Sequence, residues 1–337
     1  MKQKVFTMCC LLSSLLLFSC GGGKNNKPVI TEPSTGIKVN VPAFNPDSAY
    51  TFVSRQVAFG PRVPGSAAHE KCALYLEQKL KMYGQDVIIQ KASVRAYNGK
   101  TLNGKNIIGQ YNKASQSRIL LCSHWDSRPY ADQDKDSTKH RTPIDGANDG
   151  ASGVGVLLEI ARILSINKPD IGIDIIFLDV EDYGEPQDVK SEYGAENWGL
   201  GAQYWAKNPH VQNYKAHFGI LLDMVGASDA VFAREGFSEQ YAPDVLNKVW
   251  DAATRSGYSK YFSSEKSNPI NDDHYYINKY IMIPTIDIIQ YDNTTRSGFY
   301  TNWHTINDKI DFIDRKTLKA VGQTLLTVLF EEAKPKS

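Results

Sequence analysis

Four continuous apolar runs constrain the fold of this chain more than any other feature of its sequence. They span residues 118–122, 171–180, 218–224 and 281–289. A continuous apolar run predicts a strand covered on both faces, because a strand with one solvated face alternates apolar and polar residues. Residues 150–164 between the first two runs have helical periodicity, with Asn148 or Asp149 as the expected cap. The pattern predicts a three-layer α/β fold, in which helices flank a central, largely parallel (mixed) β-sheet.

The organisation beyond residue 46 indicates a single domain. Helical periodicity recurs over residues 66–83 and 315–332, and no repeat, linker or low-complexity break separates these elements. Two long polar segments, 131–142 and 185–199, interrupt the pattern and are expected to be active-site loops. We therefore predict one catalytic domain over residues 47–337.

The N-terminal residues predict a targeting segment. Two lysines precede an apolar stretch over residues 5–18 that is too short to span a bilayer. Residues 17–20 resemble a bacterial lipobox, in which Cys20 is lipidated, and the alternative is an ordinary cleaved signal peptide. We expect a signal peptide over residues 1–19, a lipidated flexible tether over residues 20–46, and a lipoprotein of the inner membrane facing the periplasm.

Charge and cysteine usage limit the classes of partner. The chain has 38 basic and 37 acidic residues and a formal net charge of +1. This balance gives no electrostatic footprint for nucleic acid or for an anionic membrane surface, so membrane contact is expected only through a lipid anchor at Cys20. Cys72 and Cys122 lie in apolar patterns of the predicted domain, which favours buried thiols over a disulfide between them.

Ionisable side chains lie near or just after the ends of the predicted strands. In chain order they are His124, Asp126, Glu181, Asp182, Asp223 and Asp287. Ligands of open α/β sheets bind at the carboxyl ends of the strands, so these groups are expected to converge. Asp149 alone is better explained as a helix cap, and His304 alone as a structural histidine.

Taken together, the same residues suit a metal centre. One neutral imidazole and two carboxylates from separate loops supply three zinc ligands and leave a fourth position open. Glu181, next to such a site rather than in it, can act as general base and acid if burial raises its pKa.

Seven short motifs occur in a fixed order along the chain. They are Gly60-Pro-Arg-Val-Pro-Gly-Ser66, His124-Trp-Asp-Ser-Arg128, Gly146-Ala-Asn-Asp-Gly150, Phe177-Leu-Asp-Val-Glu-Asp182, Leu221-Leu-Asp-Met-Val-Gly226, Asp272-Asp-His274 and Trp303-His-Thr305. In this order they resemble the zinc-dependent glutaminyl cyclases of the animal type, within the M28 superfamily of dizinc aminopeptidases. The resemblance runs from about residue 47 to the C-terminus.

The resemblance implies a role for each matching residue. It implies that a single zinc ion is held by Asp149, Asp182 and His304. It also implies that Glu181 transfers protons within a hydrogen-bond network that includes Asp223 and Asp272. The implied substrate pocket is lined by Trp198, Ile270, Phe299 and Trp303. The animal enzymes have glutamate at the position of Asp182 and histidine at that of Asp287.

The implied reaction is cyclisation of N-terminal glutaminyl residues of peptides and proteins to pyroglutamate, with release of ammonia, by a monomeric enzyme. The alternative is hydrolysis of N-terminal residues by a dizinc aminopeptidase, because His124, Asp149 and Asp223 supply ligands for a second ion. A third hypothesis, from another class, is a lipoprotein that binds peptides without catalysis. The sequence does not predict which proteins are modified.

Overall fold

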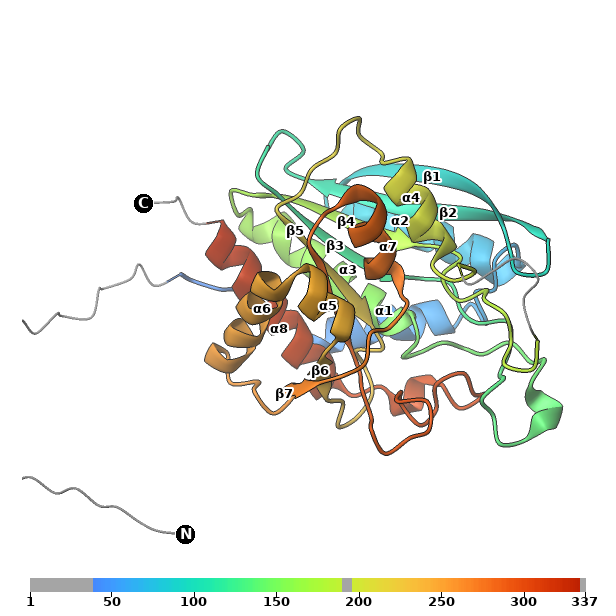
Figure 1. The fold of residues 1–337 in the computed structure, drawn as a ribbon. Coiled ribbons are helices and arrows are strands. Elements are labelled where there is room, and N and C mark those ends of the chain that lie inside the picture. Colours follow the sequence, from blue (N-terminus) through green and yellow to red (C-terminus); the bar gives the residue numbers. More distant parts are fainter. Residues whose placement is uncertain (1–38, 190–195, 334–337) are drawn as a thin grey trace, which may run out of the picture. The chain divides into compact units, whose positions relative to one another are not determined.

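The computed structural model describes residues 39–189 and 196–333, and within these residues six strands form one central sheet (Figure 1). The order across this sheet is β1 (Asp86–Arg95), β2 (Thr101–Tyr111), β4 (Gly172–Leu178), β3 (Arg118–His124), β5 (Phe218–Asp223) and β8 (Thr285–Ile289). β4, β3, β5 and β8 are parallel, while β2 is antiparallel to both β1 and β4. The largely parallel (mixed) sheet predicted from the apolar runs is confirmed.

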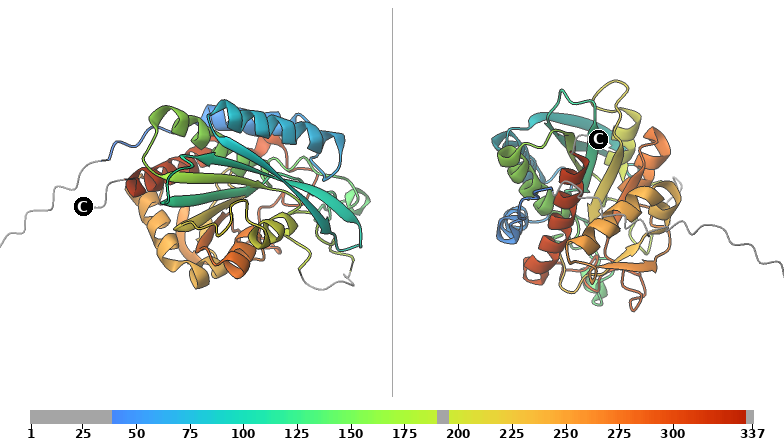
Figure 2. Two further views of the ribbon diagram at one scale, coloured as in Figure 1. Left: turned by 90° about the horizontal axis from the view of Figure 1, so that it is seen from above. Right: turned by 90° about the vertical axis from the view of Figure 1, so that its left-hand side faces the viewer.

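Helices cover both faces of the sheet, as the two further views show (Figure 2). One face packs against α1 (Pro46–Val57), α2 (Ala67–Met82), α3 (Ala151–Asn167), α6 (Pro243–Arg255) and α8 (Arg315–Glu332). The other face packs against α4 (Leu200–Lys207) and α7 (Asp273–Ile281). The smaller elements are η1 (Ser137–Lys139), β6 (Phe232–Arg234), α5 (Gly236–Tyr241), β7 (Phe262–Lys266) and η2 (Ile310–Phe312).

Alternation of side chains within the buried strands explains why their sequences are apolar throughout. In β3, Leu121 belongs to the core under α3 and α8, whereas Leu120 and Cys122 belong to the core under α4 and α7. Successive side chains of a strand point to opposite faces. When helices cover both faces, the odd-numbered and the even-numbered positions must therefore both be apolar. Cys72 and Cys122 are buried free thiols, as predicted.

Two details of the predicted elements are wrong. The run 281–289 is a strand only from Thr285, because Ile281 ends α7, Met282 has a left-handed backbone (φ 57°) and a proline follows at position 284. Neither Asn148 nor Asp149 caps α3, whose N-cap position is Gly150 and has no side-chain hydrogen bond. The Asp149 carboxylate points to His124 instead.

The described unit begins before the predicted domain boundary at residue 47. Phe44 is buried, and its backbone N–H donates to Gln323 of α8 (2.9 Å). Its ring lies against Gly322, where a Cβ atom would come within 2.2 Å of the ring. Residues 39–46, which the sequence assigned to the tether, therefore belong to the folded unit.

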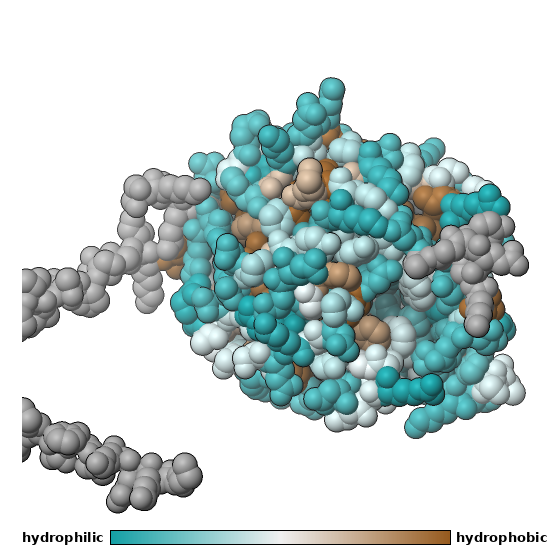
Figure 3. Space-filling model, viewed as in Figure 1, coloured by the Kyte–Doolittle hydropathy of each residue, from teal (hydrophilic) through white to brown (hydrophobic). Residues whose placement is uncertain are grey.

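One face of this unit can be followed in the space-filling view. The face in Figure 3 is largely hydrophilic, with small, separate hydrophobic patches. Within residues 39–189 and 196–333, no helix has both the length and the apolar character that crossing a bilayer requires. The signal peptide and lipidated tether predicted for residues 1–38 lie outside the described residues.

Candidate active site

The parallel strands deliver the predicted residues to one end of the sheet. His124 is the last residue of β3, Asp223 is the last residue of β5, and Glu181 and Asp182 follow β4. All four are buried. Because the carboxyl ends of parallel strands meet at the same edge of a sheet, the convergence follows from the topology.

Two buried aspartates hold the turns that carry these groups. Asp126 accepts hydrogen bonds from the backbone N–H groups of Glu181 (3.1 Å) and Asp182 (3.2 Å). Asp308 does the same for Asn148 (2.8 Å) and Asp149 (3.0 Å). Each carboxylate thus satisfies two consecutive donors that would otherwise be buried without partners. This pairing fixes the direction in which the neighbouring side chains leave the backbone.

The backbone is left-handed at three positions of the site. Val180 (φ 57°) directly precedes Glu181, Met224 (φ 49°) directly follows Asp223, and His304 itself has φ 52°. This conformation is costly for residues other than glycine, and most of all for a β-branched valine. Val180 is held by a hydrogen bond from its N–H to the Asp179 carboxylate (2.8 Å) and by one from Leu200 N–H to its carbonyl oxygen (3.1 Å).

Asp149, Asp182 and His304 come together around one point. The His304 Nε2 atom lies 3.2 Å from Asp182 Oδ1 and 3.5 Å from Asp149 Oδ2. One ligand atom from each residue lies within 4.8 Å of the others, and Asp182 Oδ2 is buried without a hydrogen-bond partner among the described residues. Two carboxylates and an imidazole from three separate segments are a ligand set suited to zinc. The residues therefore fit a zinc ion.

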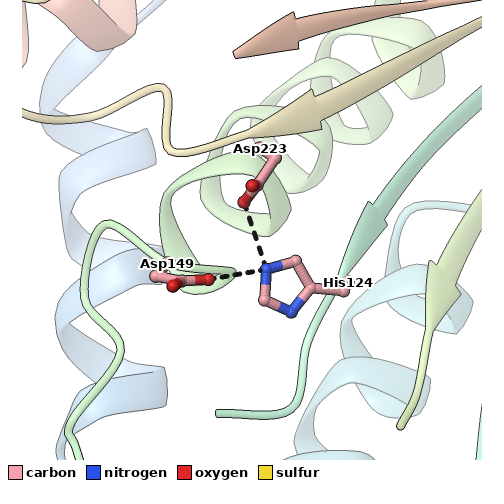
Figure 4. A group of neighbouring side chains, drawn as sticks. All are labelled: His124, Asp149 and Asp223. Atoms are coloured by element: carbon pink, nitrogen blue, oxygen red, sulfur yellow. Dashed lines mark hydrogen bonds and ion pairs between the residues drawn. The ribbon is translucent and has the colours of Figure 1, made fainter. Parts of the chain in front are cut away.

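His124 forms a second group that shares Asp149 (Figure 4). Its Nε2 atom lies 3.0 Å from Asp149 Oδ1 and 3.1 Å from Asp223 Oδ1. Burial disfavours the imidazolium, but the neighbouring carboxylates of Asp126, Asp149 and Asp223 raise the pKa of His124 well above its ordinary value. Burial together with repulsion from Asp149 raises the pKa of Asp223 to about 7, against the opposing hydrogen bond to His124. The group can hold either a shared proton or a second ion.

Glu181 stands beside both groups without belonging to either. Burial raises the pKa of its carboxyl well above the ordinary value, and repulsion from Asp272 and Asp182 adds to this despite attraction to His124. Its side chain lines the cavity described below. A carboxyl group with a raised pKa next to a metal site is suited to accept and return a proton near neutral pH.

Asp272 belongs to a third group, with His274 and Asp287. His274 Nε2 lies 2.9 Å from Glu235 Oε2, while its Nδ1 atom faces Asp287 Oδ2 at 3.8 Å. Burial and repulsion from Asp272 raise the pKa of Asp287 well above its ordinary value. The structure thus places Asp287 behind Asp272 in a buried acidic group, where it does not line the cavity.

A cavity of about 620 Å³ opens onto Asp149, Asp182 and His304, which are called the metal group from here on. Its wall contains Asp149, Glu181, Asp182, Asp223, Asp272 and His304, together with Trp198, Ile270, Phe299 and Trp303. The ring of Trp303 stacks on His304 with 3.8 Å between centroids, and Phe299 packs on Trp303 at 4.6 Å. Trp198 lies parallel to His304 at 6.1 Å. The residues to which the resemblance assigned zinc binding, proton transfer or substrate binding therefore line one cavity, whereas His124, Asp126 and Asp287 do not line it.

Four buried residues in contact with the site received no specific role in the sequence analysis, which expected only Asp126 among the converging groups. They are Arg128, Asp132, Asp126 and Asp308. Asp126 and Arg128 stand in the motif that begins at His124, and that motif was the available signal for them. Asp132 lies in the polar segment 131–142, where nothing in the sequence distinguishes it from a solvated loop residue.

Comparison with known proteins places this fold and site in a family. Residues 106–329, well over half of the chain, match the model of Peptidase family M28. The chain belongs to peptidase family M28. This M28 chain is 55% identical to a glutaminyl cyclase of Bacteroides thetaiotaomicron in a crystal structure with N-acetylhistamine (TM-score 0.85). That match covers 86% of this chain and 99% of the other.

The descriptions of two further relatives correspond to the two activities that the sequence analysis considered. A structure from Parabacteroides distasonis, described as a Zn-dependent exopeptidase, is 53% identical, with a TM-score of 0.85 and coverage of 86% of this chain and 99% of that chain. The glutaminyl-peptide cyclotransferase of Bos taurus is 25% identical over 303 residues, which cover 80% of this chain and 78% of that protein. The chain is thus similar both to named cyclases and to a named exopeptidase.

Proposed function

We infer that this chain is a glutaminyl cyclase, which converts an N-terminal glutaminyl residue to pyroglutamate and releases ammonia. The observation that carries this inference is the position of Glu181 in the cavity wall, adjacent to Asp182 of the metal group and outside that group. The similarity to named glutaminyl cyclases over almost their whole length supports it.

The reaction needs one proton acceptor and one place to hold the substrate. The α-amine nitrogen attacks the γ-carboxamide carbon, a C–N bond forms, and the bond to the amide nitrogen breaks to release ammonia. Glu181 would take the proton from the attacking amine and return it to the departing nitrogen. Zinc, when bound to Asp149, Asp182 and His304, supplies a Lewis acid that polarises a carbonyl group.

The cavity walls account for selection of a small, compact substrate end. The rings of Trp303, Phe299 and Trp198 bound the space beside the metal group. We propose that they keep the glutaminyl side chain folded back on its own amine, which gives the proximity advantage of an intramolecular reaction. Asp272 and Asp223 would stabilise the protonated form of Glu181 as neighbouring acids.

The test is incubation of the protein with a peptide that begins with glutamine. If the protein is a cyclase, the products are ammonia and a peptide of the same length whose mass is lower by that of one ammonia molecule. No free glutamine is then released. Release of free glutamine would instead identify an aminopeptidase. Neither product, from a protein that contains zinc, would favour a peptide-binding lipoprotein.

The alternative activity is hydrolysis by a dizinc aminopeptidase. The group of His124, Asp149 and Asp223 favours it, since these residues and the first group together provide ligands for two ions that share Asp149. We propose one ion per chain, because in cyclisation the substrate supplies the nucleophile and no metal-activated water is required.

Replacement of His124 by asparagine distinguishes an enzyme with one zinc ion per chain from one with two. With one zinc per chain, the wild type and the His124→Asn variant should both contain one zinc by elemental analysis, since Asp149, Asp182 and His304 are unchanged. A count of two in the wild type that falls to one in the variant would contradict the proposal and favour hydrolysis.

We also propose how the enzyme is placed in the cell. Residues 1–19 would be a signal peptide and Cys20 a lipid anchor, with a tether leading to a monomeric catalytic unit at the periplasmic side of the inner membrane. The lipobox-like residues 17–20 support this placement. The substrates would be peptides and proteins with N-terminal glutamine in that compartment.

A further inference from the structure

Arg128 is a buried arginine four residues after the end of β3, with 1% of its surface exposed. Its Nε and Nη2 atoms donate to the two carboxylate oxygens of Asp132, each at 2.8 Å. Its Nη1 atom donates to the Asp182 carbonyl oxygen (3.1 Å) and lies 3.5 Å from Asp182 Oδ1. The guanidinium also lies over the Trp198 ring, 4.7 Å from its centroid. One side chain therefore contacts a metal-group carboxylate and a ring of the cavity wall.

Asp132, which Arg128 binds, also lies next to His304. Its Oδ1 atom lies 3.4 Å from His304 Nδ1, on the side of the ring opposite the Nε2 atom that faces Asp149 and Asp182. A carboxylate at Nδ1 places the proton there and leaves the Nε2 lone pair free for a metal. Asp132 cannot turn away, because both of its oxygens are held by Arg128 and Oδ2 also accepts from Gln187 N–H (3.0 Å).

The charges of these groups balance around a divalent ion. The guanidinium of Arg128 offsets the carboxylate of Asp132, and a zinc ion would offset Asp149 and Asp182. A buried charge is tolerated only when it is paired and hydrogen-bonded. Without Arg128, the buried site would contain an excess of negative charge even after an ion had bound.

We propose that Arg128 and Asp132 are positioning residues of the zinc site. Asp132 fixes the ring of His304 with Nε2 directed at the ion. Arg128 contacts both Asp132 and Asp182 and so fixes their positions relative to each other. The inference rests on the proposed zinc site of Asp149, Asp182 and His304, and it does not depend on which reaction follows.

The test is the zinc affinity of the full-length protein with Asp132→Asn, measured by competition with a chelator in the absence of substrate. Loss of an outer-shell carboxylate typically costs about 10–100-fold in metal affinity, and we expect a loss in this range. The visible spectrum of the cobalt-loaded variant should also change, because the His304 ring is no longer fixed. Arg128→Lys keeps the charge but loses the two-pronged contact, so it should weaken zinc binding in the same direction.

Asp174→Asn is the matched control. Asp174 is buried and receives the same two-pronged contact, from Arg118 Nε and Nη2 at 2.7 Å, at the other end of β3 from His124. This control should lower the temperature of thermal unfolding and leave zinc affinity unchanged. Wild-type zinc affinity in Asp132→Asn, or an equal loss in Asp174→Asn, would overturn the proposal. A protein that binds zinc normally but releases no ammonia would refute the cyclase function and leave this inference intact.

Discussion

Replacement of Glu181 by glutamine is expected to lower turnover of an N-terminal glutaminyl peptide by about 10²–10⁴-fold, the usual contribution of a general acid–base group. Glutamine has nearly the same shape, but its amide cannot accept the proton of the attacking amine. The backbone position should persist, because Asp126 binds the N–H of residue 181 and not its side chain. The measurement is ammonia release under saturating substrate.

Zinc content distinguishes loss of the base from loss of the site. Glu181 belongs to none of the three ligand groups, so the variant should contain as much zinc as the wild type. Glu159→Gln is the control, because Glu159 is a fully buried glutamate that pairs with Arg162 on α3 and does not line the cavity. It should lower stability without lowering turnover. Near-normal turnover in Glu181→Gln would remove this residue from the mechanism.

The part of the fold that carries the site could be predicted because burial on both faces leaves a clear trace in the sequence. β3 is apolar from Ile119 to Cys122 and β4 from Ile173 to Leu178, with Asp174 as a buried exception paired to Arg118. The ends of these strands were predictable for the same reason, because polar residues begin where the flanking helices no longer cover the strand. This fixed the position of Glu181 and Asp182 to within a residue or two.

The antiparallel edge of the sheet was not predicted. Most of β1 is half-buried or exposed, and its residues neither form an apolar run nor alternate strictly. β2 is held between β1 and β4, but polar residues such as Asn106 and Gln110 interrupt its apolar positions. Asn106 donates to the carbonyl of Gly201 and Gln110 donates to Asp174. Such partners come from distant segments, so a local pattern cannot reveal that these polar residues are buried.

The supporting carboxylates were missed for a related reason. Asp308 and Asp132 act through backbone N–H groups and a histidine more than 150 residues away in the chain. An aspartate in a polar loop has the same local sequence context whether it is solvated or buried. The ligands could be inferred because their chemistry restricts them to a few residue types, whereas a supporting carboxylate is restricted only by three-dimensional position.

Replacement of His304 by asparagine is expected to remove both zinc and activity. His304 supplies the nitrogen ligand of the metal group, and without it two buried carboxylates are left to hold the ion. Asparagine tolerates a left-handed backbone as well as histidine does, so the φ of 52° at this position should not itself cause the loss. The effect on zinc affinity should exceed the 10–100-fold typical of an outer carboxylate. Elemental analysis after dialysis and the ammonia assay measure the two outcomes.

His217→Asn provides the comparison for loss of a histidine elsewhere. The His217 ring is exposed, its Nε2 atom lies 2.9 Å from the Ser117 hydroxyl, and the residue does not line the cavity. That variant should keep its zinc and its activity. The zinc site requires three segments, spread over more than 150 residues of the chain, to meet at one ion. If His304→Asn kept full zinc content, the ion would be held elsewhere, and neither the role of Glu181 nor the positioning of His304 by Asp132 would stand.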